Sequence, residues 1–393
     1  MIDVSDFEEK EDINFDNLNY YDIGFLLEAE AKNHDKRIQG AIALKYESGV
    51  GVERDYKKAF EWFEKSAAQK APGAYYHLAN MYEKGLGVIE NPQKANECLS
   101  KSIKLLEQHL ENPRCLFDLA SRYRDGEGVE QDYKKAVELL EQAAKSNLPE
   151  AYYNLAILYW NGEGVEKDEQ KANEYFLKTA ELYENFSGRI SYQFLLGLMY
   201  YKGEGVEQDY KKAFEWYKKA AENDAPEAQC QLGGMYADGL GTEQDLKKAF
   251  EYMEKSAVAG DADGMRELAN LYCEGSGIEQ DYQKALEWYE KAAEKGDAAA
   301  TFNIGVMYYN GEGVEQNYKK ALEFFEKSAA EGYPEAQTQI GDMYGDGIGV
   351  EKDSRKAIEC YMKVKDWFLE KYKDNDEVIK AFKEMEETYN AEK

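Results

Sequence analysis

Three histidines and five cysteines are the residues of this 393-residue chain that could act as bases, nucleophiles or zinc ligands. Nucleophilic catalysis needs a base held close to the nucleophile, but His34, His77 and His109 lie in separate segments and outside any His-Glu-x-x-His motif. The cysteines show neither a Cys-x-x-Cys pair nor the paired Cys/His spacing of a zinc site. They are Cys98, Cys115, Cys230, Cys273 and Cys360. We therefore expect no catalytic residues, no metal site and no cofactor.

A Gly-x-Gly pair recurs along the chain in acidic surroundings, and loops of this kind hold phosphate or calcium in other proteins. A phosphate loop needs Gly-x-x-x-x-Gly-Lys-Ser/Thr after a strand. An EF-hand needs acidic ligands at alternate positions and a final glutamate. The segment DGEGVEQD at residues 125–132 has neither pattern. We predict that its glycines form a turn and that its last aspartate caps a helix.

The glycine pair marks an internal repeat. Successive first glycines are 36, 41, 36, 41, 36, 36, 36 and 36 residues apart, which gives nine copies of a 36-residue unit with two five-residue insertions. The first glycines are Gly49, Gly85, Gly126, Gly162, Gly203, Gly239, Gly275, Gly311 and Gly347. The insertions precede the third and fifth copies, where we expect them to lengthen the second helix or its loop.

Each unit carries two helical patterns, one on either side of the glycine pair. In residues 149–165, Ala151, Leu155 and Leu158 share one helical face. Gly162 follows this run, where a left-handed helix stop is expected. In residues 209–221, Asp209 is a suitable N-cap and a wide apolar stripe follows it. The unit is therefore predicted to be a pair of helices.

Alanine occurs ten residues after the loop glycine in every copy, which indicates close helix–helix contact. These alanines are Ala59, Ala95, Ala136, Ala172, Ala213, Ala249, Ala285, Ala321 and Ala357. One helix pair cannot bury both apolar stripes alone, so neighbouring units must stack. We predict an all-α array with nine tandem repeats over 37–367. Capping helices are expected over 17–36 and 368–393, after an acidic, disordered segment at 1–16.

The formal charge of −29, from 49 basic and 78 acidic residues, disfavours binding to nucleic acid or to an anionic membrane. Two interpretations of the acidity remain open, namely solubility and attraction of a basic partner. No secretory signal and no run of about 18 apolar residues is evident. The sparse cysteines suit a reducing compartment, so we expect a cytoplasmic protein.

The pattern A-x-x-x-L-G-x-M-Y-x-x-G-x-G-V-x-x-D-Y-x-K-A-x-x-W-Y-x-K-A-A resembles the Sel-one-like repeat (SLR), a relative of the tetratricopeptide repeat. LLGLMYYKGEGVEQDYKKAFEWYKKAAEND at 195–224 and FNIGVMYYNGEGVEQNYKKALEFFEKSAAEG at 302–332 are the best copies, and the resemblance covers roughly residues 37–367. It implies a right-handed α/α superhelix and a role as an adaptor or scaffold in protein complexes. Secreted relatives carry two cysteines in every repeat, a pair that this chain lacks.

The resemblance also implies that the first helices line the concave face of the superhelix. Positions nine, five and two before each loop glycine share a helical stripe that differs from the core stripe. We predict that a partner segment docks on this stripe in repeats 4–7. Repeat 6 offers only Cys230, Gly234 and Ala237, which would leave a notch between larger side chains. The predicted binding residues are Tyr153, Ile157, Trp160, Phe194, Leu198, Tyr201, Arg266 and Asn270.

Three functions are compatible with this pattern. An adaptor or scaffold would hold a protein or peptide in the groove, and no small-molecule substrate is evident. An inhibitor or immunity-type protein would instead sequester one enzyme or toxin. An enzyme, for example a hydrolase with a metal or cysteine site, is the third, which metal analysis and thiol labelling would test. Aromatic plus aliphatic side chains on the stripe also suit packing between repeats, so packing remains the alternative to binding there.

Overall fold

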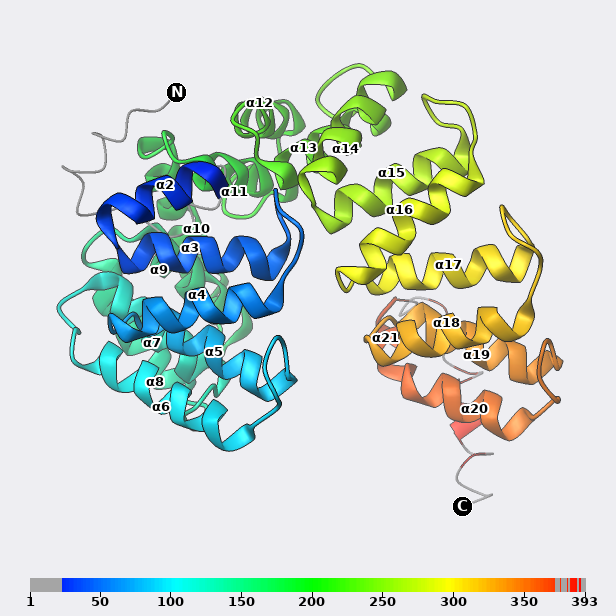
Figure 1. Ribbon diagram of the computed structural model, residues 1–393, viewed down its shortest axis with the longest axis horizontal. Coiled ribbons are helices and arrows are strands. Elements are labelled where there is room, and N and C mark those ends of the chain that lie inside the picture. Colours follow the sequence, from blue (N-terminus) through cyan, green and yellow to red (C-terminus); the bar gives the residue numbers. More distant parts are fainter. Residues whose placement is uncertain (1–22, 372–374, 376–379, 381, 387–388, 390–393) are drawn as a thin grey trace. The chain divides into compact units, whose positions relative to one another are not determined.

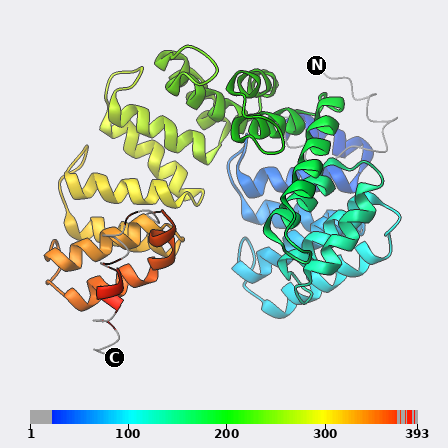
Figure 2. The same cartoon turned by 180° about the vertical axis from the view of Figure 1, so that it is seen from behind.

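The computed structural model describes residues 23–371, 375, 380, 382–386 and 389. The regular elements among these residues are helices, with no strand, and the helices follow one another as hairpins (Figures 1 and 2). The helices are α2 (Ile23–Asn33), α3 (Lys36–Ser48), α4 (Tyr56–Ala68), α5 (Pro72–Lys84), α6 (Pro92–Glu107), α7 (Pro113–Asp125), α8 (Tyr133–Ala144), α9 (Pro149–Asn161), α10 (Glu169–Asn185), α11 (Ile190–Lys202), α12 (Tyr210–Ala221), α13 (Pro226–Asp238), α14 (Leu246–Ala259), α15 (Ala262–Glu274), α16 (Tyr282–Glu294), α17 (Ala298–Asn310), α18 (Tyr318–Ala330), α19 (Pro334–Asp346), α20 (Ser354–Lys363) and α21 (Lys365–Lys371). The prediction of an all-α fold built from helix pairs is confirmed.

The first helix of every repeat, from α3 to α19 in odd numbers, has 13 residues and ends at the loop glycine. Gly162 has φ +75° and its N–H donates to the carbonyl of Leu158, which closes the last turn of α9. Residues with a Cβ enter this left-handed region only at a cost, so glycine ends the helix reproducibly. The predicted helix stop is confirmed in all nine repeats.

The second helices begin where the sequence predicted an N-cap. The carboxylate of Asp209 accepts hydrogen bonds from the backbone N–H groups of Lys211 and Lys212, at 3.0 and 3.1 Å. Such bonds satisfy amide groups that the first turn of a helix leaves unpaired. The residue at this position also caps each of the eight remaining second helices. These residues are Asp55, Asn91, Asp132, Asp168, Asp245, Asp281, Asn317 and Asp353.

The two five-residue insertions lengthen second helices, as predicted. Helices α6 and α10 have 16 and 17 residues, whereas the other second helices have 10 to 14. The extra residues come at the end of the repeat, after the positions that pack against the first helix. The register of the following repeat is therefore kept.

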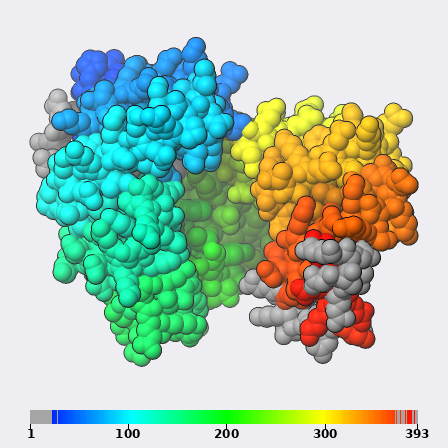
Figure 3. Space-filling model, turned by 90° about the horizontal axis from the view of Figure 1, so that it is seen from below, coloured from blue at the N-terminus to red at the C-terminus, as the bar shows by residue number. Residues whose placement is uncertain are grey.

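Within each unit, the core runs from one repeat into the next. One cluster joins Leu106 of α6, Leu116 of α7, Leu140 of α8 and Leu155 of α9, all of them buried. The nine alanines ten residues after the loop glycine are at most 5% exposed, as their predicted packing role requires. Within each unit, the atoms of successive repeats form a continuous surface (Figure 3). Stacking therefore buries the apolar stripes that one helix pair would expose.

The chain divides into two units, one up to Gln244 and one from Asp245 onward, with the boundary between α13 and α14. At the start of the first unit, Leu26 and Ala29 of α2 pack against Ile38 and Ile42 of α3. The predicted segment 1–16 and residues 17–22 of the predicted cap lie outside the described residues, as does much of 372–393. No described helix is long and apolar enough to cross a membrane.

In the described part of the C-terminal segment, the ring of Phe382 packs against that of Phe368, with centroids 5.2 Å apart. Phe382 is buried. Lys365 also forms an ion pair with Glu386 at 2.6 Å. These contacts attach the described residues of the segment to the end of the second unit.

Candidate functional site

The predicted stripe on α9 is separate from the core side of this helix. Tyr153 and Ile157 are half-buried and Trp160 is 44% exposed. Leu155 and Leu158, which lie on the core side, are buried. Among the described residues of the first helices, Trp160 is the exposed large apolar side chain; the others of that kind lie on α2, on second helices or in loops.

The stripe continues on α11, where Phe194, Leu198 and Tyr201 are half-buried. The ring of Phe194 packs against Tyr217 of α12, with centroids 5.6 Å apart. The ring of Tyr201 meets Tyr210 edge-on, at 5.3 Å. Both aromatic side chains thus pack within their repeat and still keep part of their surface accessible. We call Tyr153, Ile157, Trp160, Phe194, Leu198 and Tyr201 the α9–α11 face.

The next first helix, α13, leaves open space beside this face. A Cβ placed on Gly234 would have no atom within 4 Å. Cys230 is buried and Ala237 is half-buried, so neither extends far from the helix. The small side chains that the sequence predicted as a notch therefore leave space at Gly234.

A hydrogen bond that the sequence analysis missed joins repeats 4 and 5 at the α9–α11 face. The hydroxyl of Tyr153 donates to Oε2 of Glu204 at 3.1 Å. Burial raises the pKa of Tyr153 to about 12, and the charge of Glu204 adds to the effect. Tyr153 lies nine residues before one loop glycine and Glu204 one residue after the next, but this spacing alone does not show that the two side chains meet.

Tyr217 lies beneath the face with an unpaired hydroxyl. It is fully buried, and its hydroxyl has no hydrogen-bond partner among the described residues. At the same repeat position, Tyr289 donates to Asn270 at 2.5 Å and Tyr361 donates to Asp342 at 2.6 Å. Both acceptors lie five residues before a loop glycine. In repeat 5 this position is Leu198, which offers no acceptor.

Replacing Tyr217 with phenylalanine should raise the free energy of unfolding by about 1 kcal/mol, because a buried hydroxyl without a partner is unfavourable. Phenylalanine already fills this position in repeats 1, 4 and 8, as Phe63, Phe176 and Phe325. The matched variant Tyr289→Phe should lower the free energy of unfolding by about 1 kcal/mol, because the substitution removes the hydrogen bond to Asn270. Urea denaturation of both variants checks this. If both variants were less stable than the unsubstituted protein, the Tyr217 hydroxyl would not be unfavourable and the prediction would be wrong.

Arg266 and Asn270, the polar members of the predicted patch, lie in the second unit. The guanidinium of Arg266 forms ion pairs with Asp297 at 2.7 Å, Asp263 at 2.8 Å and Glu267 at 2.9 Å. Burial lowers the pKa of Arg266, but these carboxylates outweigh burial and the pKa is raised. Arg266 thereby ties α15 to the start of α17. Its participation and that of Asn270 in binding stay predictions.

Replacing Arg266 with methionine should destabilise the second unit by about 2 kcal/mol, less than for a fully buried pair because the side chain stays partly exposed. The loss arises because the nearly buried carboxylate of Asp297 is left without its cation. Arg355→Met is the control, since the pair of Arg355 with Glu359 is exposed and should contribute under about 0.5 kcal/mol. Chemical denaturation compares the two. Equal destabilisation by Arg266→Met and Arg355→Met would mean that the ion pairs of Arg266 do not stabilise the contact between α15 and α17.

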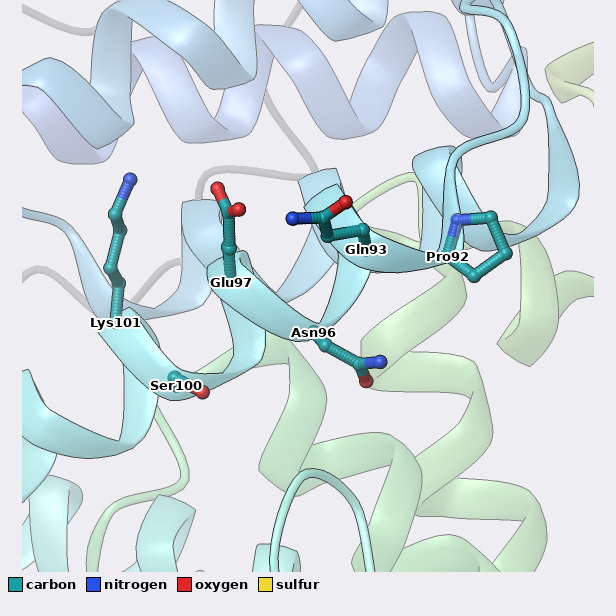
Figure 4. A pocket seen from close by; sticks show the side chains of 6 residues that line it. All are labelled: Pro92, Gln93, Asn96, Glu97, Ser100 and Lys101. Atoms are coloured by element: carbon teal, nitrogen blue, oxygen red, sulfur yellow. The ribbon is translucent and has the colours of Figure 1, made fainter.

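The other features carry no comparable chemistry. No group of three or more His, Cys, Asp or Glu side chains suited to a metal occurs in the described part of the chain. His77 is partly buried, stacked on Phe63 at 4.6 Å and paired with Glu47 at 3.1 Å, so it is less exposed than a surface histidine. A hollow (Figure 4) is lined by residues of one helix, α6, namely Pro92, Gln93, Asn96, Glu97, Ser100 and Lys101.

Comparison with known proteins gives a family match along most of the chain. A family described as the Sel1 repeat matches residues 41–70, 72–105, 113–148, 149–183, 190–224, 226–261, 262–297, 298–333 and 334–363. A Sel1 repeat protein structure from Oxalobacter formigenes is 30% identical, with a TM-score of 0.49 over 66% of this chain and 99% of that one.

Two further solved structures are similar at lower scores. The protective antigen c5321 of uropathogenic Escherichia coli is 29% identical over 90% of this chain and 79% of that one, with a TM-score of 0.32. Immunity protein Pa5087 of Pseudomonas aeruginosa is 21% identical over 58% and 83%, with a TM-score of 0.40. No curated protein matches the chain.

Proposed function

Because the chain belongs to the Sel1 repeat family, we propose that it is an adaptor or scaffold whose α9–α11 face binds a segment of a protein partner. Sel1 repeat arrays are generally protein-binding scaffolds and usually not enzymes.

The exposed indole of Trp160 is the observation that carries the proposal. A tryptophan is costly to leave in water, and Trp, Tyr and Arg are the residues that most often dominate binding energy at protein interfaces. Trp160 lies beside half-buried Tyr153 and Ile157 on the same helix, and Phe194 and Tyr201 on α11 are the other aromatic members of the face. Open space at Gly234 on the next first helix gives room for a partner side chain.

The charge distribution supports the same face. The nine first helices hold 13 acidic and 9 basic residues, a formal charge of −4, although the whole chain carries −29. The nine second helices hold 25 basic and 19 acidic residues, a formal charge of +6, so most of the acidity lies in the loops between helices, where it favours solubility. The first helices are left nearly neutral, as the cores of protein interfaces usually are.

Replacing Trp160 and Tyr201 together with alanine should weaken capture of the partner roughly 100-fold or more, because two aromatic anchors are lost. The partner is first identified by affinity capture and mass spectrometry, and its affinity is then measured with purified proteins. Circular dichroism should stay unchanged. Leu177→Ala is the control, since Leu177 is an exposed apolar residue of second helix α10. Unaltered affinity in the double variant would refute the docking face.

A regulatory inhibitor, of the immunity type, is the second candidate, favoured by the charge of −29. Such a protein would sequester one basic enzyme or toxin by charge attraction. A single partner in a tight one-to-one complex would support the inhibitor, and several partners of moderate affinity would support the scaffold. Analytical ultracentrifugation of the reconstituted complex distinguishes them.

We also propose a cytoplasmic location. All five cysteines are thiols, and three of them are buried. Thiols of this kind suit a reducing compartment. Cell fractionation tests the location.

A further inference from the structure

Two tyrosine–glutamate pairs of the first unit occupy equivalent positions in different repeats. The hydroxyl of Tyr76 donates to Glu127 and that of Tyr153 donates to Glu204, both at 3.1 Å. In each pair, the tyrosine lies nine residues before one loop glycine and the glutamate one residue after the next. Each pair therefore consists of a phenol ring and a carboxylate at the same positions of the repeat.

The first of these pairs holds an arginine of the chain itself. The guanidinium carbon of Arg122 lies 3.5 Å from the centroid of the Tyr76 ring, and the guanidinium forms an ion pair with Glu127. A cation over an aromatic face and beside a carboxylate is attracted by both. The Tyr76–Glu127 pair is thus an arginine-binding arrangement that already has its occupant.

The second pair has the same binding groups and a different residue at the arginine's position. Arg122 lies four residues before its loop glycine, and the corresponding residue of repeat 5 is Met199, which is buried. Glu204 has an ion pair with Lys202 at 3.6 Å. The side chain of Glu204 is 29% exposed and that of Lys202 is 51% exposed, so an incoming group can reach the carboxylate and displace the lysine.

Repeat 5, which contains Glu204, holds a further polar group. The buried hydroxyl of Tyr217 has no hydrogen-bond partner among the described residues. Burial raises the pKa of Tyr217, and the charges of Tyr201 and Glu204 raise it further. The oxygen of an unpaired phenol can accept a hydrogen bond from a cation. Repeat 5 therefore combines a carboxylate with an unsatisfied hydroxyl and several aromatic rings.

We propose that the Tyr153–Glu204 pair binds an arginine side chain of the partner, as the Tyr76–Glu127 pair binds Arg122. This inference rests on the α9–α11 face being the docking surface. Arginine fits better than lysine, because its planar guanidinium stacks on a ring while two of its N–H groups face a carboxylate. The formal charge of −29 favours the approach of a basic segment. The partner segment is therefore a basic peptide with arginine as its anchor.

The probe is a fluorescein-labelled nonapeptide, Gly-Ser-Arg repeated three times, titrated with the full chain by fluorescence anisotropy. A matched peptide carries citrulline, which keeps the shape of arginine and lacks its charge. We expect the arginine peptide to bind roughly tenfold tighter than the citrulline peptide. Glu204→Gln should remove this difference. Met199→Arg should also remove it, because the chain's own guanidinium would then occupy the pair.

The control is Glu163→Gln, which removes the same charge at the same position of repeat 4, where Glu163 contacts Asn161 and no tyrosine. It should leave the preference for arginine intact. Equal loss in Glu163→Gln and Glu204→Gln would overturn the proposal, because only general attraction would remain. Equal binding of both peptides, or none at millimolar concentration, would also overturn it.

Failure of this inference can be told from failure of the proposed function. If the arginine peptide shows no preference while the Trp160 and Tyr201 double variant still loses its partner, the docking face stands and the arginine anchor is wrong. If the double variant keeps full affinity, the docking face itself is wrong.

Discussion

Replacing Gly241 with alanine is expected to lower the free energy of unfolding by about 4 kcal/mol, whereas Gly51→Ala should lower it by about 1 kcal/mol. The two glycines occupy the same loop position and have nearly the same φ, +71° and +73°. A Cβ on Gly241 would lie 2.1 Å from the backbone oxygen of Tyr210 in the preceding repeat, but a Cβ on Gly51 would have nothing within 4 Å.

The comparison isolates the contact between repeats from the cost of the left-handed backbone. Both variants incur the conformational cost, and Gly241→Ala alone must also push the loop away from α12. Gly51 has no helix pair of a preceding repeat to meet, which explains its open surroundings. Urea denaturation of both variants gives the difference. Equal destabilisation by the two variants would mean that the contact between the Gly241 loop and the backbone of the preceding repeat does not contribute to stability.

Replacing Ala213 with leucine is expected to destabilise the first unit by about 3 kcal/mol, because three added carbons must fit between closely packed helices. Ala213 is fully buried on α12. The closeness is seen in repeat 9, where a Cβ on Gly345 would lie 3.7 Å from the Cβ of Ala357, at the equivalent alanine position. This distance leaves no room for a longer side chain.

Glu215→Leu is the matched control, with the same new side chain at an exposed position of α12. It should change stability by under about 0.5 kcal/mol. Thermal denaturation followed by circular dichroism compares the two variants. A mild effect of Ala213→Leu would mean that the helices can separate and that alanine is not required there.

Most of the fold could be predicted because its signals are local and periodic. A glycine that must take positive φ ends each first helix, and an aspartate or asparagine that accepts from free amides begins each second helix. Each signal needs only a few neighbouring residues, so nine copies at one spacing fix the helix pairs. The buried alanines follow from the same register.

The candidate site could be predicted only in part. Helical periodicity places Tyr153 and Trp160 on one side of α9, away from the core. It does not reveal the hydrogen bond from Tyr153 to Glu204, because these residues are 51 positions apart and meet only through the stacking of two repeats. The ion pair of Arg266 with Asp297 was missed for a related reason, since Asp297 lies in the next repeat, at the N-cap of α17. Side-chain partners between repeats depend on geometry that spacing alone does not specify.

Site-specific photocrosslinking tests the docking face most directly. A benzoylphenylalanine replaces Trp160 in one variant and Leu177, which is more exposed but lies on a second helix, in another. After irradiation in the native cell, the variant at position 160 should form covalent adducts with partner protein, and the variant at position 177 should not. Adducts of equal yield at both positions, or at position 177 alone, would contradict the account.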